Sequence, residues 1–232
     1  MEKKKMSIKK RVLLGMAFLI LILIILFVFH GARNLIIIRK LQSNFSQYAD
    51  STNYKETTIS KGADGVTTTL IYYKKDNKGL RIFQKNDADS EDYAKMSLYY
   101  NGERIDMFTE TNEEKIATLN TGSSSLFNSK LANGLEEGTI DFNAFILLTK
   151  IRKIEIAGKE GYHIKNYFGA GFLYAEDDEM ELFYEEDTGL LMKQIFSETT
   201  VEKEYEFGNV DDSVFIEPNI GEYSLSIAEN ND

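Results

Sequence analysis

The sequence predicts an α+β protein in which a large, mostly antiparallel sheet follows one transmembrane helix. Three observations carry this prediction. An uninterrupted apolar run covers residues 12–29, apolar residues at helical spacing continue over 33–49, and from Asn53 onward β-branched and aromatic runs alternate with short turns. Runs of the last kind are typical of consecutive antiparallel hairpins. About 200 residues after the run are enough for one domain with its own core.

The apolar run from Val12 to Phe29 is long enough to cross a membrane. It contains no charged residue and no Pro, Asn or Gln. As a helix it spans about 27 Å at about 1.5 Å per residue, close to the roughly 30 Å of a bilayer's hydrocarbon core. A cleavable signal peptide has a shorter apolar region, about 7–15 residues, and a small-residue cleavage site. We therefore favour an uncleaved anchor and keep the signal peptide as the alternative.

The charges beside the run predict its direction. Six basic residues precede it, and only Arg33, Arg39 and Lys40 follow closely. Because Lys and Arg near the ends of a first span favour the cytoplasmic side, we expect a single-pass protein of the cell membrane with a cytoplasmic N-terminus. The expected organisation is a basic cytoplasmic stub (1–11), a transmembrane helix (12–29), an extracytoplasmic domain (33–225) and an acidic tail (226–232).

The composition excludes several classes of function. Residues 31–232 hold 21 basic and 36 acidic residues, a net charge of −15. Such a domain repels nucleic acid, so no nucleic-acid partner is expected, and it repels anionic lipid head groups as well. The chain has no Cys, which excludes disulfides and thiolate metal sites.

The stretch from Arg33 to Ala49 predicts an amphipathic helix. Its apolar residues are three or four positions apart and share one helical face. We favour a helix that packs on the following sheet. The alternatives are a helix on the outer membrane surface and a continuation of the anchor helix beyond a hinge at Gly31. The apolar face consists of Leu35, Ile38, Leu41, Phe45 and Tyr48.

The rest of the domain is predicted to consist of hairpins around a central irregular region. Asn101-Gly102 is a two-residue hairpin signal. Residues 120–138 are rich in Ser, Asn and Gly and predict a loop, and 141–149 predict a short helix capped by Asp141. The expected strands cover residues 54–60, 66–74, 80–85, 94–100, 103–109, 114–119, 153–157, 161–168, 180–185, 190–199 and 201–207.

Several of these strands are apolar on both faces, as in 70–73, 98–100, 182–184 and 190–192. A sheet of this kind must be covered twice or must enclose a cavity. The candidate residues for the lining of a ligand cavity are Tyr72, Phe83, Tyr100, Phe145 and Phe183. A shift of one residue in the facing of a strand would exchange its two faces.

The last seventy residues show an order that resembles a known superfamily. An Asp-Thr-Gly-Leu turn (187–190) precedes a Lys-bearing strand, a Glu-Tyr-Glu-Phe strand (204–207), and Val210-Asp211-Asp212 with Phe215 and Pro218. Together with Lys55 to Thr58, this resembles the lipoprotein-carrier-like superfamily, which includes the sigma-factor regulatory lipid sensors. The resemblance implies a large curved antiparallel sheet, an unclosed half-barrel with helices on its concave side. It also implies that acyl chains or a protein partner are held there without catalysis.

No other motif assigns a chemistry. Residues 87–92 are acidic, but they lack the Gly and the final Glu of a calcium loop, and a solvated loop is the favoured interpretation. His163 is the one His of the domain and cannot form a His-rich metal site. No phosphate-binding Gly loop or nucleophile motif is present. We expect no catalytic residue, cofactor or metal.

Two hypotheses follow. The first is a non-catalytic binding domain that holds a lipid, a lipoprotein or an apolar peptide. The second is a regulatory or interaction subunit of the cell envelope that binds a membrane protein partner and no lipid. An envelope enzyme is the least supported interpretation, because it would need a cleft with convergent polar groups.

Overall fold

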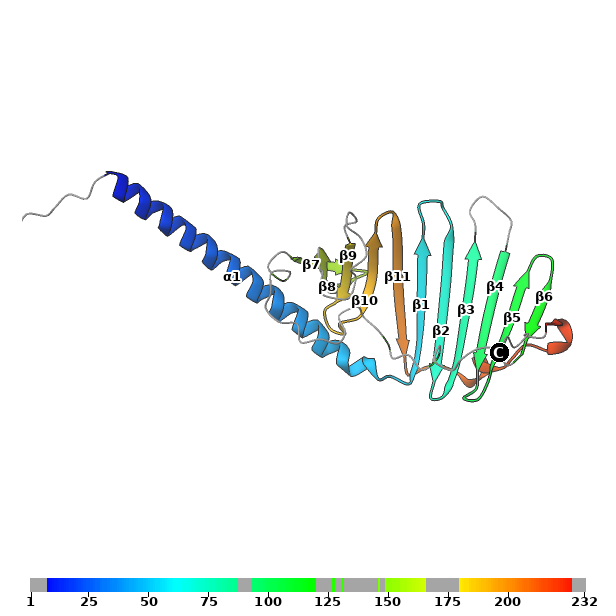
Figure 1. The fold of residues 1–232 in the computed structure, drawn as a ribbon. Helices are drawn as coiled ribbons and strands as arrows, with labels where there is room; N and C mark the ends of the chain where they lie inside the picture. The colour runs from blue at the N-terminus through cyan, green and yellow to red at the C-terminus, as the bar shows by residue number, and fades with distance from the viewer. Residues whose placement is uncertain are drawn as a thin grey trace, which may run out of the picture.

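A computed structural model describes residues 8–86, 93–119, 127, 131, 146, 149–165 and 180–226. They form one long helix and one twelve-stranded sheet (Figure 1). The strand order is β12-β6-β5-β4-β3-β2-β1-β11-β10-β9-β8-β7, so the sheet has two separate ends and is unclosed. Every pairing is antiparallel except that of β12 with β6. The predicted α+β class and the large antiparallel sheet are confirmed.

Strands β1 to β11 correspond to the eleven predicted strands, whereas β12 was not predicted. The strands are β1 (Asn53–Lys61), β2 (Thr67–Lys75), β3 (Lys78–Asn86), β4 (Tyr93–Tyr100), β5 (Ile105–Thr111), β6 (Lys115–Thr118), β7 (Lys150–Ile156), β8 (Lys159–Lys165), β9 (Met180–Glu185), β10 (Leu191–Phe196), β11 (Thr199–Phe207) and β12 (Ser224–Ser226).

One predicted turn and one predicted strand end differ from the structure. Asn101-Gly102 is part of a four-residue connection between β4 and β5, because the Asn101 side chain accepts hydrogen bonds from the N–H groups of Glu103 and Arg104. The predicted strand 190–199 ends earlier, at Phe196, because Ser197 adopts a φ of 50° and starts a tight turn into β11. A positive φ of this kind is rare in strands and common in hairpin turns.

Helix α1 (Ile8–Ala49) is continuous, and its two parts have different surroundings. Its first part carries the exposed apolar run, and it is long and apolar enough to cross a membrane. Its second part packs on the sheet through Ile38, Leu41 and Phe45, which are at most 5% exposed. The predicted packing is therefore confirmed. The helix continues through Gly31 without a hinge, and Gly31 is buried.

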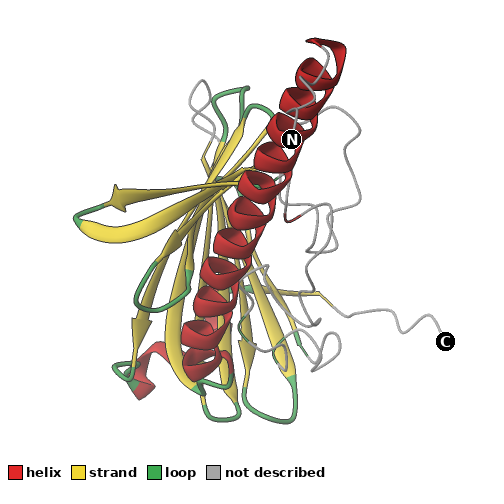
Figure 2. Ribbon diagram, turned by 90° about the vertical axis from the view of Figure 1, so that its left-hand side faces the viewer, coloured by secondary structure: helices red, strands yellow, loops and turns green. Residues whose placement is uncertain are grey.

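The core consists of two clusters between α1 and the sheet. Figure 2 shows α1 crossing in front of the strands. The first cluster joins the middle of α1 to the β7–β10 end of the sheet and contains Ile37, Ile38, Leu41, Ile146, Ile151, Tyr162, Ile164, Leu182, Tyr184 and Leu191. The second joins the end of α1 to the central strands and contains Phe45, Tyr54, Tyr72, Tyr100, Ile105, Phe127, Leu131 and Leu190.

The C-terminal segment covers part of the opposite face. It contains two 3-10 helices, η2 (Asp212–Phe215) and η3 (Ile220–Glu222), and then β12. Tyr223 packs edge-on against Phe108, with ring centroids 5.1 Å apart, and donates a hydrogen bond to Glu110. Asp212 forms ion pairs with Lys75 and Lys78. The segment is thereby fixed to β2, β3 and β5.

Some predictions lie outside the described residues. These are the acidic segment 87–92, the last three residues of the predicted strand 161–168, the tail beyond Ser226, nearly all of the loop 120–138, and most of the helix 141–149. Of that helix, Ile146 is described, in helical conformation and 1% exposed.

Candidate functional site

The register of strands β1 to β5 arranges the side chains of the α1-bearing face in rows that cross the sheet. Alternate residues of a strand share a face, and the paired positions then define which side chains are neighbours. The row nearest to the end of α1, the buried row, contains Tyr54, Lys74, Gly79, Tyr100 and Ile105. The next row, the mixed row, contains Glu56, Tyr72, Arg81, Leu98 and Met107.

The buried row is closed by aromatic packing. Tyr100 stacks on Phe127 with ring centroids 5.2 Å apart, and Tyr54 is 1% exposed. Gly79 is required here, because a Cβ atom would lie 2.3 Å from the Phe127 ring. Burial raises the pKa of the Tyr54 hydroxyl, so this row is uncharged at neutral pH except for Lys74. Burial also lowers the pKa of Lys74.

The mixed row places charges over aromatic rings. The Arg81 guanidinium lies 4.8 Å from the centre of the Tyr72 ring, and the Tyr72 hydroxyl donates to the backbone oxygen of Phe127 at 3.1 Å. Glu56 forms an ion pair with Lys203 of β11 at 2.8 Å. Glu56 also accepts a hydrogen bond from Thr58. Glu56 is thus paired within the face, and the Arg81 guanidinium is held over an aromatic ring.

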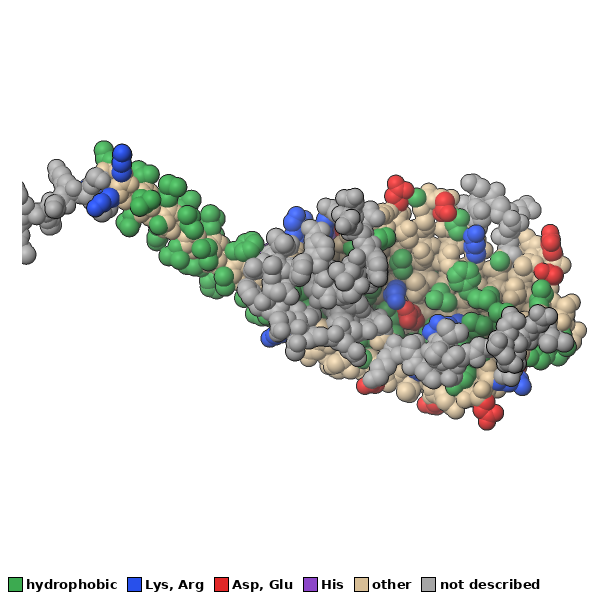
Figure 3. Space-filling model, in the orientation of Figure 1, with side chains coloured by type: hydrophobic (Ala, Val, Ile, Leu, Met, Phe, Trp, Pro, Cys, Tyr) green, Lys and Arg blue, Asp and Glu red, His purple; other side chains and the backbone are tan. Residues whose placement is uncertain are grey.

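The third row is apolar at its centre and half open. Leu70, Phe83 and Met96 are direct neighbours across β2, β3 and β4, and we call them the apolar row. Phe83 is 38% exposed, and Leu70 and Met96 are partly exposed. Figure 3 shows hydrophobic side chains reaching the surface over the central strands of this face, between charged groups. The apolar row is the candidate site, because its chemistry suits an apolar ligand.

Three of the five predicted lining residues lie together. Tyr100, Tyr72 and Phe83 occupy the buried, mixed and apolar rows of one face. Phe183 lies on the other face, because its neighbours Leu182 and Tyr184 point into the core with α1. There it stacks on His163 with centroids 4.5 Å apart. Phe145 lies outside the described residues. Sequence reasoning missed Leu70 and Met96 as site residues, although the alternation of β2 and β4 places them beside Phe83.

A second group of polar residues links α1 to the sheet, and we call it the Glu186 clamp. The Glu186 carboxylate is 2.5 Å from Lys40 Nζ and 3.1 Å from Lys153 Nζ. It accepts a hydrogen bond from Tyr162 at 3.1 Å, and the Glu186 backbone oxygen accepts one from Asn44 at 2.8 Å. Hydrogen bonds from the two lysines lower the pKa of Glu186 to about 2. These partners lie on α1, β7 and β8, so the clamp joins the helix to the end of the sheet. No sequence motif marked it.

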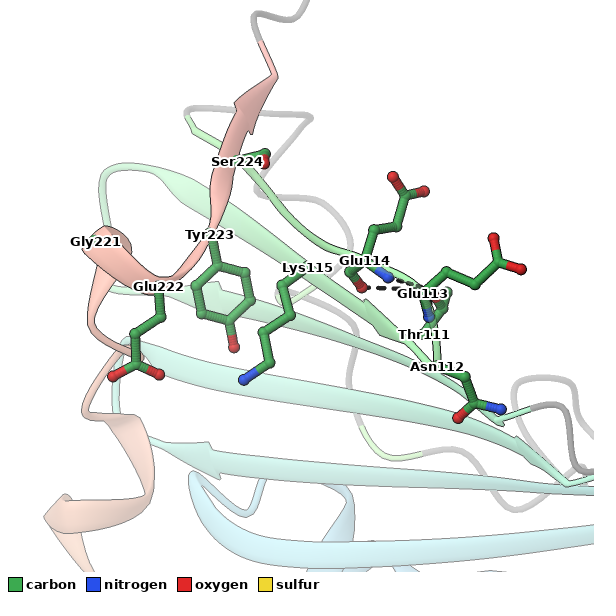
Figure 4. Close-up of a pocket in the computed structure, with 9 residues that line it drawn as sticks. All are labelled: Thr111, Asn112, Glu113, Glu114, Lys115, Gly221, Glu222, Tyr223 and Ser224. Atoms are coloured by element: carbon green, nitrogen blue, oxygen red, sulfur yellow. Dashed lines mark hydrogen bonds between the residues drawn. The ribbon is translucent and has the colours of Figure 1, made fainter.

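A polar depression lies between the β5–β6 turn and the C-terminal segment, with a volume of about 570 Å³ (Figure 4). The Thr111 hydroxyl accepts hydrogen bonds from the backbone N–H groups of Glu113 and Glu114. Lys115 Nζ lies 5.6 Å from the centre of the Tyr223 ring. These interactions are those of an ordinary capped turn. Within the described part of the chain, no three His, Cys, Asp or Glu residues are grouped to hold a metal ion.

Comparison with known proteins assigns no family. No family model matches the chain, and no curated protein matches it. A crystal structure of an uncharacterized conserved protein from Thermus thermophilus aligns with a TM-score of 0.42 and 8% sequence identity. The alignment covers 82% of this chain and 98% of the Thermus chain.

Proposed function

We propose that this protein is a membrane-anchored, non-catalytic binding domain that holds the acyl chain of a lipid or lipoprotein, or an apolar peptide, against the apolar row. The observation that carries the proposal is the half-open state of this row. Leu70, Phe83 and Met96 adjoin a closed aromatic core but are themselves only partly covered. Contiguous apolar patches on a protein surface mark binding sites, whereas apolar side chains that are exposed singly are ordinary.

The free energy gained by burying apolar groups on the apolar row suits an acyl chain as the ligand. Each buried methylene contributes about 0.8 kcal/mol, so a chain of several methylenes lying along the apolar row gains several kcal/mol before the cost of immobilisation. The mixed row lies directly beside it with Arg81, and Lys203 extends the apolar row on β11. An unclosed half-barrel with α1 on its concave side is the shape that this proposal requires.

The membrane placement belongs to the same proposal. The run Val12–Phe29 crosses the bilayer, and the basic residues before it hold the N-terminus in the cytoplasm. The sheet then works outside the cell membrane. Its position at the end of a continuous helix brings the apolar row near a source of acyl chains.

A second function is favoured by a different surface. The C-terminal segment exposes Ile216 by 72%, Ile220 by 40% and Leu225 by 63%. Three exposed large apolar residues within ten positions suit a protein interface. In this alternative the domain is a regulatory or interaction subunit that binds a membrane protein partner and carries no lipid.

Photo-crosslinking from inside the apolar row tests the proposal. Phe83 is replaced by the photoreactive analogue benzoylphenylalanine in the full chain, in its own membrane. The matched control carries the analogue at Phe196, which is 36% exposed at the end of β10. After irradiation, the mass of the peptide around each position is measured.

The expected result is an adduct with the mass of an acyl lipid or lipoprotein at position 83 and none at 196. Adducts at both positions would indicate contact with bulk lipid and would overturn the site. A protein adduct at 83 without lipid, or no adduct at all, would overturn the lipid function. The first of these would favour the alternative.

A further inference from the structure

We propose that the outer edge of the sheet at β7 is a cationic surface that binds the anionic phospholipid head groups of the membrane crossed by α1. The surface consists of Lys150 and Arg152, with Lys165 beside them on β8. The inference rests on the anchor of the proposed function but concerns a different part of the molecule from the apolar row.

The first argument is the position of this edge relative to the membrane surface. The backbone oxygen of Thr149, directly before β7, accepts a hydrogen bond from Asn34 Nδ2 at 2.7 Å and lies 3.1 Å from His30 Nε2. Asn34 lies five residues beyond Phe29, about 7.5 Å along the helix at about 1.5 Å per residue. The head-group layer extends about 5–8 Å beyond the hydrocarbon core. Lys150 therefore begins its strand at head-group level.

The arrangement of the sheet supports this depth. Figure 1 shows β7 and β8 at the end of the sheet that lies toward the N-terminal half of α1. The strand order makes β7 the last strand at that end. The buried Asn34 also donates to the backbone oxygen of Ile146 at 3.1 Å. The edge is thus held against the helix directly after the apolar run.

The second argument is charge. Lys150 and Arg152 are exposed and share the face of β7 that points away from the α1-bearing core. Within the described ranges neither has an ion-pair partner. On β8, Lys165 and His163 both contact the carboxylate of Glu181, at 3.1 and 3.0 Å. Cations near a leaflet of anionic lipid are attracted within a Debye length.

This surface contrasts with the rest of the domain. The net charge of −15 over residues 31–232 repels an anionic membrane as a whole. A local group of cations at head-group level opposes that repulsion at the point where the domain is closest to the lipid head groups. Charged residues on an edge strand also prevent pairing with other strands, but that role needs no particular sign and no position near the bilayer.

The test is made with the full chain in lipid nanodiscs that contain phosphatidylcholine and one quarter phosphatidylglycerol. Native mass spectrometry counts the phosphatidylglycerol and phosphatidylcholine molecules that stay bound to the ejected protein. The test variant is Lys150→Gln with Arg152→Gln. The control variant is Lys61→Gln with Lys85→Gln, two exposed lysines at the free ends of β1 and β3. Both variants remove two positive charges.

We expect phosphatidylglycerol to be enriched on the native chain and on the control. In the test variant its affinity should fall about five-fold per removed charge, on the order of 25-fold for both, and 0.5 M salt should weaken the native enrichment. Equal enrichment in the test variant, or none in the native chain, would overturn the inference. The crosslink from position 83 should persist in the test variant, so the two proposals can fail separately.

Discussion

At the scale of single residues, Glu186 joins three elements of the chain. Its carboxylate is only 11% exposed and meets Lys40 of α1 and Lys153 of β7. A carboxylate removed from water is stabilised only if its partners remain. Both lysines are about half exposed, so solvent screens part of each interaction. The net contribution is therefore moderate, although the geometry is close.

The substitution Glu186→Gln should lower the free energy of unfolding by about 1–2 kcal/mol, because the amide keeps the shape of the side chain and loses both charge-assisted hydrogen bonds. Urea denaturation of the full chain in nanodiscs, followed by circular dichroism, measures this loss. The control is Glu160→Gln, which removes a 72% exposed partner of the same Lys153 and should cost much less. Equal losses would show that burial of Glu186 contributes nothing.

The pH dependence of the same comparison has a defined sign. The pKa of Glu186 is lowered from 4.5 to about 2 in the folded chain, so the folded state favours the charged form. The stabilisation is fully present above about pH 4.5 and is lost as the pH falls toward 2. The difference between the native chain and Glu186→Gln should therefore be constant at neutral pH and shrink in acid.

At the scale of elements, the turn between β9 and β10 lies against the second half of α1. Gly189 in this turn has a φ of +67°, and a Cβ atom there would lie 2.0 Å from the backbone oxygen of Leu41. Backbone meets backbone at this point, so no side chain can move aside. The close approach lets the helix seat Leu41 and Phe45 in the two clusters.

Replacing Gly189 by Ala should destabilise the chain far more than the same change at Gly158. Gly158 also has a positive φ, +81°, but a Cβ atom there would meet nothing within 4 Å. The control carries only the backbone strain, about 1–2 kcal/mol, whereas Gly189→Ala adds the displacement of α1, about 1–3 kcal/mol more. Urea denaturation measures both variants. A cost at Gly189 no larger than that at Gly158 would argue against the close packing of helix and turn.

The elements also show what periodicity can and cannot predict. The face with Ile38, Leu41 and Phe45 was predictable because three- and four-residue spacing is a local property. Of the alternatives for this stretch, the continuation of the anchor helix is present, but the hinge at Gly31 is not. Burial of Gly31 against neighbouring structure compensates the weak helix propensity of Gly. Phe183 was predicted to line the same cavity as Tyr72, but the structure places it on the other face of the sheet. Leu182-Phe183-Tyr184 offers two apolar faces, and only packing against α1 selects one.

At the scale of the whole molecule, the strand order depends on contacts distant in sequence. β1 pairs with β11, so Tyr54 lies opposite Phe207. Local turn signals predicted the hairpins but not this pairing of β1 with β11, which joins the two halves of the sheet. They also did not indicate the Glu186 clamp. The rows of the candidate site arise only when five strands take their register. For this reason the sequence indicated Tyr72, Phe83 and Tyr100 but not Leu70 and Met96.

The orientation of the whole chain can be tested with thiols, since the sequence has no Cys. Glu113→Cys places one exposed thiol in the β5–β6 turn, and Ser7→Cys places one in the N-terminal stub. A membrane-impermeant maleimide should label the first variant in intact cells, and the second only after lysis. Labelling in the reverse order would place the sheet in the cytoplasm and would remove the basis for the extracytoplasmic function.

The unbroken course of α1 sets the working range of the domain. Because the helix passes from the apolar run into the sheet without a tether, the domain has almost no freedom to swing or to extend. In a membrane the domain would meet other molecules at one fixed distance from the bilayer surface and in one orientation. Its targets would therefore have to come to it by lateral diffusion, and a target held farther from the membrane than the sheet itself would stay out of reach.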